Sequence, residues 1–375
     1  MYLTERIIGI ITYMIIMLII IFLIYKSKSK KKLKHYLIIY WFLLAIMAFF
    51  YIPAESADLY RLFDVLHKYS QYGLEDLFSA MGEVNVPSQC LYFWIIGKIG
   101  IDGLLPAITS MIFFGNVFYI VYKCACKYEL DNKNVAISLL LFMEMGKFLE
   151  VVSGIRSLMA FSIIALCVYK EIIENKKIYK NIVLYIFAAF MHPAAMILTL
   201  IRFLLLLLQK ENNTVKKIFN IFLGIILLFV AYKFAGNIIE SATNKAESYM
   251  GHKAYSYIWE YLISWAYVIF STFSIIKYNK VLQKQREIKN IKMFVLIFNI
   301  IIVLLCFEYS IFTRFQTFSS ILFIPVFAYM LQKMGNEKNM NKKYYTYFFV
   351  LVSIAIFFIA GIRGNLSGYK FLLFL

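Results

Sequence analysis

The stretch Phe190-Met191-His192-Pro193-Ala194-Ala195 lies in the middle of an apolar run, residues 181–208, that is long enough to cross a membrane. Proline removes a backbone donor and disfavours helical geometry at the residue before it, so the sequence predicts that the helix breaks at His192. A titratable ring inside the hydrocarbon region is costly and normally faces a protein interior or a water-filled cavity. We therefore predict a broken helix whose turn carries a functional histidine.

The composition of the whole chain is that of a polytopic membrane protein. Of its 375 residues, 62% are hydrophobic and 18% are aromatic, which predicts one all-α transmembrane domain over residues 1–375. The net charge is +18, but the lysines concentrate between the apolar runs, so they indicate membrane orientation and no nucleic-acid partner. The five cysteines lack the spacing of a metal site, and no Asp-x-Asp motif occurs, so we expect no metal and no cofactor.

The apolar runs predict a bundle of about 11 to 12 membrane segments. They cover residues 7–25, 36–52, 104–122, 134–152, 155–170, 181–208, 217–235, 258–276, 293–311, 315–331 and 344–362. Six of the nine residues in 26–34 are lysine, which predicts that this loop is cytoplasmic and that the N-terminus lies outside. Residues 53–103 then form an outer loop with interfacial or re-entrant helices.

The lysine-rich loops also decide the path of residues 181–208. If this run crossed the membrane once, every later lysine-rich loop would lie outside, against the usual charge bias. If the chain instead reverses at His192, all of these loops are cytoplasmic. Residues 181–191 would then reach about 16 Å, roughly half of the hydrocarbon core. The sequence therefore predicts a broken helix hairpin, with His192 partway into the membrane and reached from outside.

With this topology, a few polar residues fall on the outer side of the membrane. The main candidates are Asp58, Arg156, His192 and Arg314, and the secondary candidates are Arg61, Glu260 and Glu308. Arg156 and Arg314 are each expected where a helix begins, although a cation is disfavoured near a helix N-terminus. Such a broken rule often marks a functional site. Two guanidiniums beside the helix that starts at Pro193 suit a phosphate or diphosphate.

Each of these residues also fits a structural role when it is taken alone. A single histidine in an apolar run is often a packed side chain with its polar atoms satisfied, and an arginine at a membrane edge is often an anchor that extends to the interface. Asp58 could simply pair with Arg61. The functional interpretation therefore depends on whether the candidates lie together.

Four short motifs, in this order, resemble the EpsG family of bacterial exopolysaccharide and capsule polymerases, which are related in role to the Wzy O-antigen polymerases. The motifs are Asp-Leu-Tyr-Arg at 58–61, Gly-Ile-Arg-Ser-Leu-Met-Ala at 154–160, Phe-Met-His-Pro-Ala-Ala at 190–195 and Thr-Arg-Phe at 313–315. The sequence departs from the family at Ser157, where glutamine is usual, and at Pro193, where a small polar residue is more common. The resemblance implies a metal-independent membrane glycosyltransferase, similar to the GT-C class, that uses lipid-linked sugars.

We accordingly expect a polymerase that joins undecaprenyl-diphosphate-linked repeat units at the outer leaflet of the bacterial cytoplasmic membrane, in exopolysaccharide, capsule or O-antigen synthesis. Arg156 and Arg314 would bind the diphosphate of the donor glycan, while His192 and Asp58 are rival catalytic groups for the acceptor hydroxyl. Expected partners are the two lipid-linked substrates, membrane lipid, a flippase and a chain-length regulator.

Three other functions fit parts of the pattern. A flippase for lipid-linked oligosaccharides would also need a cationic cavity, but its polar residues should line a path to both faces. A membrane acyltransferase that decorates surface glycans could use a histidine, but it would need an acyl-donor site. A structural subunit of a polysaccharide complex would need neither a cationic cavity nor an acyl-donor site.

The hairpin at His192 is testable without any structure. A single cysteine placed at Asn212 should resist a membrane-impermeant maleimide added to intact cells and react after the cells are opened, because the reversal keeps this loop inside. Labelling of Asn212→Cys in intact cells would show instead that residues 181–208 cross the membrane once.

Overall fold

The computed structural model describes residues 2–53, 55, 57–144, 147–207, 258–306 and 309–334. Its secondary-structure elements within these ranges are all helices, as the sequence predicted. The predicted segments 217–235 and 344–362 lie outside the described residues, and so do Glu308 and the side chain of Glu260.

The helices follow one another along the chain with short connections. They are α1 (Tyr2–Lys26), α2 (Lys30–Phe49), α3 (Asp58–Ser70), α4 (Leu74–Glu83), α5 (Pro87–Ile99), α6 (Leu104–Lys127), α7 (Asn132–Glu144), α8 (Lys147–Ser153), α9 (Ile155–Ile172), the 3-10 helix η1 (Ile178–Asn181), α10 (Ile182–Ala189), α11 (Pro193–Leu207), α13 (Ile258–Lys277), α14 (Asn279–Leu282), α15 (Arg286–Leu304) and α16 (Tyr309–Met334). The predicted segment 134–152 corresponds to α7 and α8, and the predicted outer loop 53–103 contains α3, α4 and α5.

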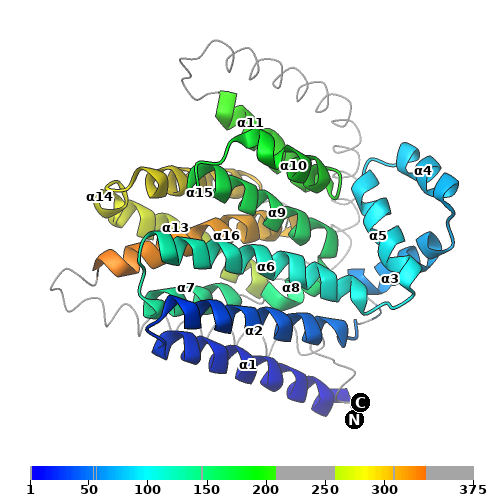
Figure 1. Ribbon diagram of the computed structural model, residues 1–375, viewed down its shortest axis with the longest axis horizontal. Helices are drawn as coiled ribbons and strands as arrows, with labels where there is room; N and C mark the ends of the chain where they lie inside the picture. Colours follow the sequence, from blue (N-terminus) through cyan, green and yellow to red (C-terminus); the bar gives the residue numbers. More distant parts are fainter. Residues whose placement is uncertain are drawn as a thin grey trace.

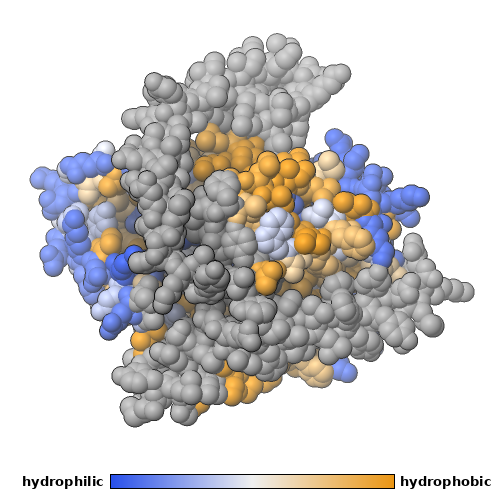
Figure 2. All heavy atoms as spheres, turned by 180° about the vertical axis from the view of Figure 1, so that it is seen from behind, coloured by the Kyte–Doolittle hydropathy of each residue, from blue (hydrophilic) through white to orange (hydrophobic). Residues whose placement is uncertain are grey.

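Four of the described helices are long and apolar enough to cross a membrane, namely α1, α2, α6 and α16. Large apolar side chains are exposed at helical spacing along α1, including Ile11, Ile15 and Phe22, and along α13, including Ile269 and Phe273. Figure 2 shows hydrophobic residues across the middle of one face and hydrophilic residues gathered at its two ends. This distribution is that of a membrane helix bundle, whose apolar surface faces lipid. The number of about 11 to 12 segments and the likeness to the GT-C class stay predictions.

Two helices form the centre of the bundle, α9 and α16. α9 packs against α6, α10, α11 and α16, and nearly every residue of α9 from Ile155 to Tyr169 is buried. The apolar span of α16 is 94% buried, and this helix also contacts α7, α13 and α15. The pairs α1 with α7 and α2 with α6 cover one side of this centre (Figure 1).

The lysine-rich connections gather at one end of the bundle. Lys30 donates to the Oδ1 atom of Asn132 at 3.1 Å, and Lys127 pairs with Glu287 at 3.1 Å. The Oε1 atom of Gln332 accepts from the backbone N–H of Asp131 at 2.9 Å. These contacts join the loops after α1 and α6, the start of α15 and the end of α16. The described loops among those predicted to be cytoplasmic therefore share one end, and the side of the membrane that this end faces stays a prediction.

The chain reverses direction between α10 and α11. Glu171, near the end of α9, accepts a hydrogen bond from Asn181 at 3.1 Å and two from Arg202 at 3.0 and 2.8 Å. Asn181 and Arg202 are 21 positions apart, which would separate them by about 31 Å in one straight helix. Both reach the same carboxylate because residues 190–192 form a turn, so the structure has the hairpin that the lysine pattern predicted.

The outer helices α3, α4 and α5 project from the opposite end of the bundle (Figure 1). α3 packs closely on α5 at Gly97, where a Cβ atom would lie 2.9 Å from the backbone oxygen of Leu66 and 3.1 Å from the Cβ atom of Ser70. The missing side chain at this position therefore allows α3 to approach α5. This contact holds the C-terminal half of α3 against α5.

We predict that Gly97→Ala loosens α3 from α5 and destabilises this contact by about 1–3 kcal/mol, because an added Cβ meets backbone atoms that cannot move aside. Limited proteolysis within residues 58–70 of the purified protein measures this loosening. Gly82→Ala on α4 is the matched control, since a Cβ atom added at Gly82 would have no other atom within 4 Å. Equal cleavage rates for the two variants would contradict the prediction.

Candidate functional site

Asp58 and Arg61 form an ion pair at the start of α3. Asp58 is the first residue of the helix, where a negative charge is stabilised by the helix dipole, and Arg61 follows three positions later on the same face. The side chains of Arg61 and Asp58 are 71% and 43% exposed. The pair therefore lies at the rim of the bundle, open to a ligand.

Arg314 of α16 extends to the same carboxylate. Its Nη2 atom lies 3.9 Å from the Oδ2 atom of Asp58, and its side chain is 26% exposed. The sequence predicted that a helix begins at Arg314, but α16 begins at Tyr309, so this arginine lies in the second turn. The effect of the helix dipole falls off within the first turn, so the dipole argument made for Arg314 is weaker than expected.

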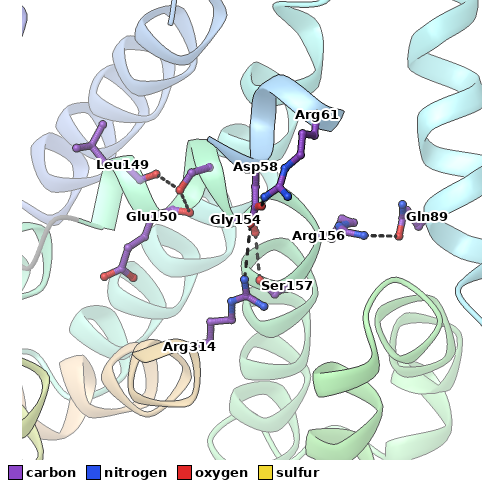
Figure 3. A network of polar contacts seen from close by, with 10 residues as sticks. Asp58, Arg61, Gln89, Leu149, Glu150, Gly154, Arg156, Ser157 and Arg314 are labelled. Atoms are coloured by element: carbon purple, nitrogen blue, oxygen red, sulfur yellow. Dashed lines mark hydrogen bonds and ion pairs between the residues drawn. The ribbon is translucent and has the colours of Figure 1, made fainter. Parts of the chain in front are cut away.

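Arg156 is the second residue of α9. The helix starts directly after α8 because Gly154 permits a tight turn, in which a Cβ atom would lie 2.9 Å from the backbone oxygen of Glu150. The Nη1 atom of Arg156 donates to the Oε1 atom of Gln89 on α5 at 3.3 Å. Asp58 lies between Arg61 and Arg314, while Arg156 points toward Gln89 beside them (Figure 3).

These residues form one cluster, which we call the arginine cluster: Asp58, Arg61, Arg156 and Arg314. Asp58, Arg61 and Arg314 all lie within electrostatic range of the Arg156 guanidinium. Three guanidiniums and one carboxylate leave a formal charge of +2, since 3 − 1 = 2. Such an excess at the edge of an apolar bundle favours an anion with more than one charge, and guanidiniums bind phosphate oxygens in a bidentate manner.

His192 lies at the turn between α10 and α11, which pack on the same α9 that carries Arg156. Its Nδ1 atom accepts a hydrogen bond from the backbone N–H of Ala194 at 3.1 Å, so the ring caps the start of α11. A backbone N–H can only donate, so Nδ1 holds a lone pair and a neutral ring carries its proton on Nε2. In this tautomer the donor atom of the ring is therefore Nε2.

The depth of His192 follows from helix lengths. His192 is 11 positions after Asn181, or about 16 Å at 1.5 Å per residue. Arg156 is 15 positions before Glu171 on α9, or about 22 Å. Asn181 is bonded to Glu171, so both distances start from one level. The path to His192 is the shorter of the two, so His192 lies deeper than Arg156 from the end that holds α3.

Three polar residues near the cluster were missed in the sequence. Gln89 is buried and contacts Arg156, and the Oγ1 atom of Thr317 donates to the Oε2 atom of Glu150 at 2.8 Å. Thr317 lies three positions after Arg314, on the same face of α16. This spacing could have predicted from the sequence that Thr317 lies near the site. The sequence pointed to Gln89 only weakly, as a polar residue in the first turn of a helix that begins at Pro87. No sequence pattern pointed to Glu150, because its partner is on a distant helix.

The described residues include no group of three or more His, Cys, Asp or Glu side chains placed to hold a metal ion.

The fold and the site together define a helical membrane protein with a cationic cluster at one end of its bundle. Among protein-family models, that of the EpsG family matches residues 91–372. The chain belongs to the EpsG family, the family of exopolysaccharide polymerase-like proteins, and the resemblance drawn from its motifs is confirmed. No significant match is found among curated proteins or among solved structures. The matched residues include Arg156, His192 and Arg314.

The charge of the arginine cluster leads to a binding prediction. Asp58→Asn should tighten the binding of inorganic pyrophosphate by about threefold to tenfold, because it removes the negative charge that competes for Arg61 and Arg314. Isothermal titration of the purified protein in detergent measures the affinity. Glu75→Gln, which removes an exposed carboxylate from α4, is the control and should leave the affinity unchanged. Weaker binding by Asp58→Asn would show that the anion does not bind at these arginines.

Proposed function

We propose that this protein is a polysaccharide polymerase that joins undecaprenyl-diphosphate-linked oligosaccharide repeat units at the outer leaflet of the bacterial cytoplasmic membrane. The N-terminus would lie outside and the lysine-rich end of the bundle would face the cytoplasm, where positive loops are favoured. A flippase that delivers the substrates and a regulator of chain length are the expected partners. Exopolysaccharide, capsule and O-antigen synthesis are the processes that use such an enzyme.

One observation carries the proposal most directly. In a member of the EpsG family, guanidiniums from α3, α9 and α16 meet at one end of an apolar helix bundle. A lipid diphosphate combines an apolar tail with a multiply charged head, so it matches both an apolar surface and a cationic end. Separate helices supply the three arginines, so only the folded bundle forms this site.

The proposed reaction is a glycosyl transfer with a diphosphate leaving group. The bond between the anomeric carbon of the donor glycan and its diphosphate oxygen breaks, and a bond from an acceptor hydroxyl oxygen to the same carbon forms. Negative charge then develops on the lipid diphosphate that leaves. Arg156 and Arg314 stabilise this charge, and preorganised cations at a leaving group are an effective means of lowering a barrier.

The acceptor hydroxyl must lose its proton during the transfer. In this proposal Asp58 accepts it, and the support is that its carboxylate lies next to Arg61 and Arg314. A weak base suffices at this step because the hydroxyl becomes acidic once its oxygen has begun to bond to the anomeric carbon. His192, whose Nδ1 atom accepts from the N–H of Ala194, orients the acceptor in this proposal. The two rival candidates thus take different roles.

Replacing both arginines by lysine tests the diphosphate assignment. The Arg156→Lys, Arg314→Lys double variant keeps the charge but loses bidentate binding, so we expect polymer formation to fall about 100-fold or more. Arg286→Lys, at an exposed arginine at the opposite end of the bundle, is the matched control. Polymer formation is measured by gel analysis of glycan chain length. A fully active double variant would overturn the assignment.

The lipid-linked pool of a deletion strain tests the function itself. A polymerase deletion should accumulate single lipid-linked repeat units in the outer leaflet, because delivery continues while joining stops. Accumulation in the cytoplasmic leaflet would indicate a flippase instead. Chains of normal length that lack a substituent would indicate an acyltransferase.

A further inference from the structure

A buried ion pair lies at the base of the hairpin, far along α9 from the arginine cluster. The Glu171 and Arg202 side chains are each 5% exposed, and both the Nε and Nη2 atoms of Arg202 donate to the Oε2 atom of Glu171. The other carboxylate oxygen, Oε1, accepts from Asn181. The Arg202 guanidinium also lies 5.8 Å from the ring centroid of Phe294 on α15. We call the three residues Asn181, Glu171 and Arg202 the hairpin anchor.

The hairpin anchor is costly for stability alone. Two charges removed from water lose solvation that their attraction barely repays, and an apolar pair of similar size is often equally stable. Charged residues within a membrane bundle are rare and usually have a specific role. A role beyond packing is therefore to be expected for Glu171 and Arg202.

The anchor joins both legs of the hairpin to one point. Asn181 ends η1 just before α10, and Arg202 lies in α11, so Glu171 holds the start of one leg and a late turn of the other. The legs are nearly equal, 11 positions from Asn181 to His192 and 10 from His192 to Arg202, or about 16 and 15 Å. α10 has only 8 residues, and a helix this short is not stable in isolation. Its position is therefore set by what holds its ends.

We propose that Glu171 is a positioning residue that, through Asn181 and Arg202, sets the depth of His192 relative to the arginine cluster. Because α9 carries Glu171 at one end and Arg156 at the other, it serves as a rigid spacer between the anchor and the diphosphate-binding arginines. The role in catalysis rests on the proposed function. The geometric claim, that the anchor fixes the depth of the turn, is independent of the proposed function.

The test uses the full-length protein and separates stability, geometry and activity. In the Glu171→Met, Arg202→Leu double variant, apolar side chains replace the ion pair, so thermal unfolding in detergent should stay close to that of the unchanged protein. The depth of the turn is measured by the rate at which Ala194→Cys reacts with an impermeant maleimide, with Cys126 and Cys306 replaced by serine. Lys98→Cys, exposed on α5, is the labelling control.

We expect the double variant to label at Ala194→Cys with a rate changed about threefold or more and to lose about tenfold or more of its polymer formation, because small misplacements of a catalytic group have large effects on rate. The Lys98→Cys rate should not change. An unchanged rate at Ala194→Cys would overturn the geometric claim, and a changed rate with full polymer formation would overturn the role in catalysis.

A second variant keeps the proposal testable if the double variant does not fold. Asn181→Leu removes one leg of the anchor and leaves the ion pair intact, so it should shift the labelling rate at Ala194→Cys in the same way. No shift in this folded variant would also overturn the proposal. Failure of the polymerase function would appear elsewhere, in a deletion strain that does not accumulate single lipid-linked repeat units in the outer leaflet, whatever the labelling rates.

Discussion

The burial of α9 is the constraint on which the rest of the structure depends. Helices on several sides enclose it, so the middle of this helix accepts only apolar and small polar side chains. Charged groups are confined to its ends, Arg156 at one and Lys170 and Glu171 at the other. The distance between the two ends is set by the helical rise and varies little. α9 thus relates two polar sites within an otherwise apolar bundle.

The two ends handle their charge in opposite ways. Glu171 is matched by Arg202 and by the amide of Asn181, and little of the pair is exposed. Arg156 contacts the neutral Gln89, and its charged neighbours are mostly other arginines. A matched buried charge holds helices in register, while an unmatched positive charge at a rim leaves a place for an anion. The contrast separates the end of α9 with paired charges from the end with excess positive charge.

The site also depends on residues that precede the part of the chain matched by the family model. Asp58, Arg61 and Gln89 come from α3 and α5, before residue 91, while Arg156 and Arg314 come from α9 and α16. The two groups meet because α3 docks on α5 at Gly97 and because Asp58 approaches Arg314. The outer helices thus complete a cluster whose other members come from the centre of the bundle.

The sequence by itself determined the class of fold, the reversal at His192 and the common end of the described lysine-rich loops, because apolar length, proline geometry and loop charge are local properties. It also named the four members of the arginine cluster. Only the tertiary structure decided that Asp58 lies between Arg61 and Arg314, that Gln89 meets Arg156, and that Arg202 pairs with Glu171. These contacts join residues on separate elements, and their partners follow from how the helices pack, which no local pattern records.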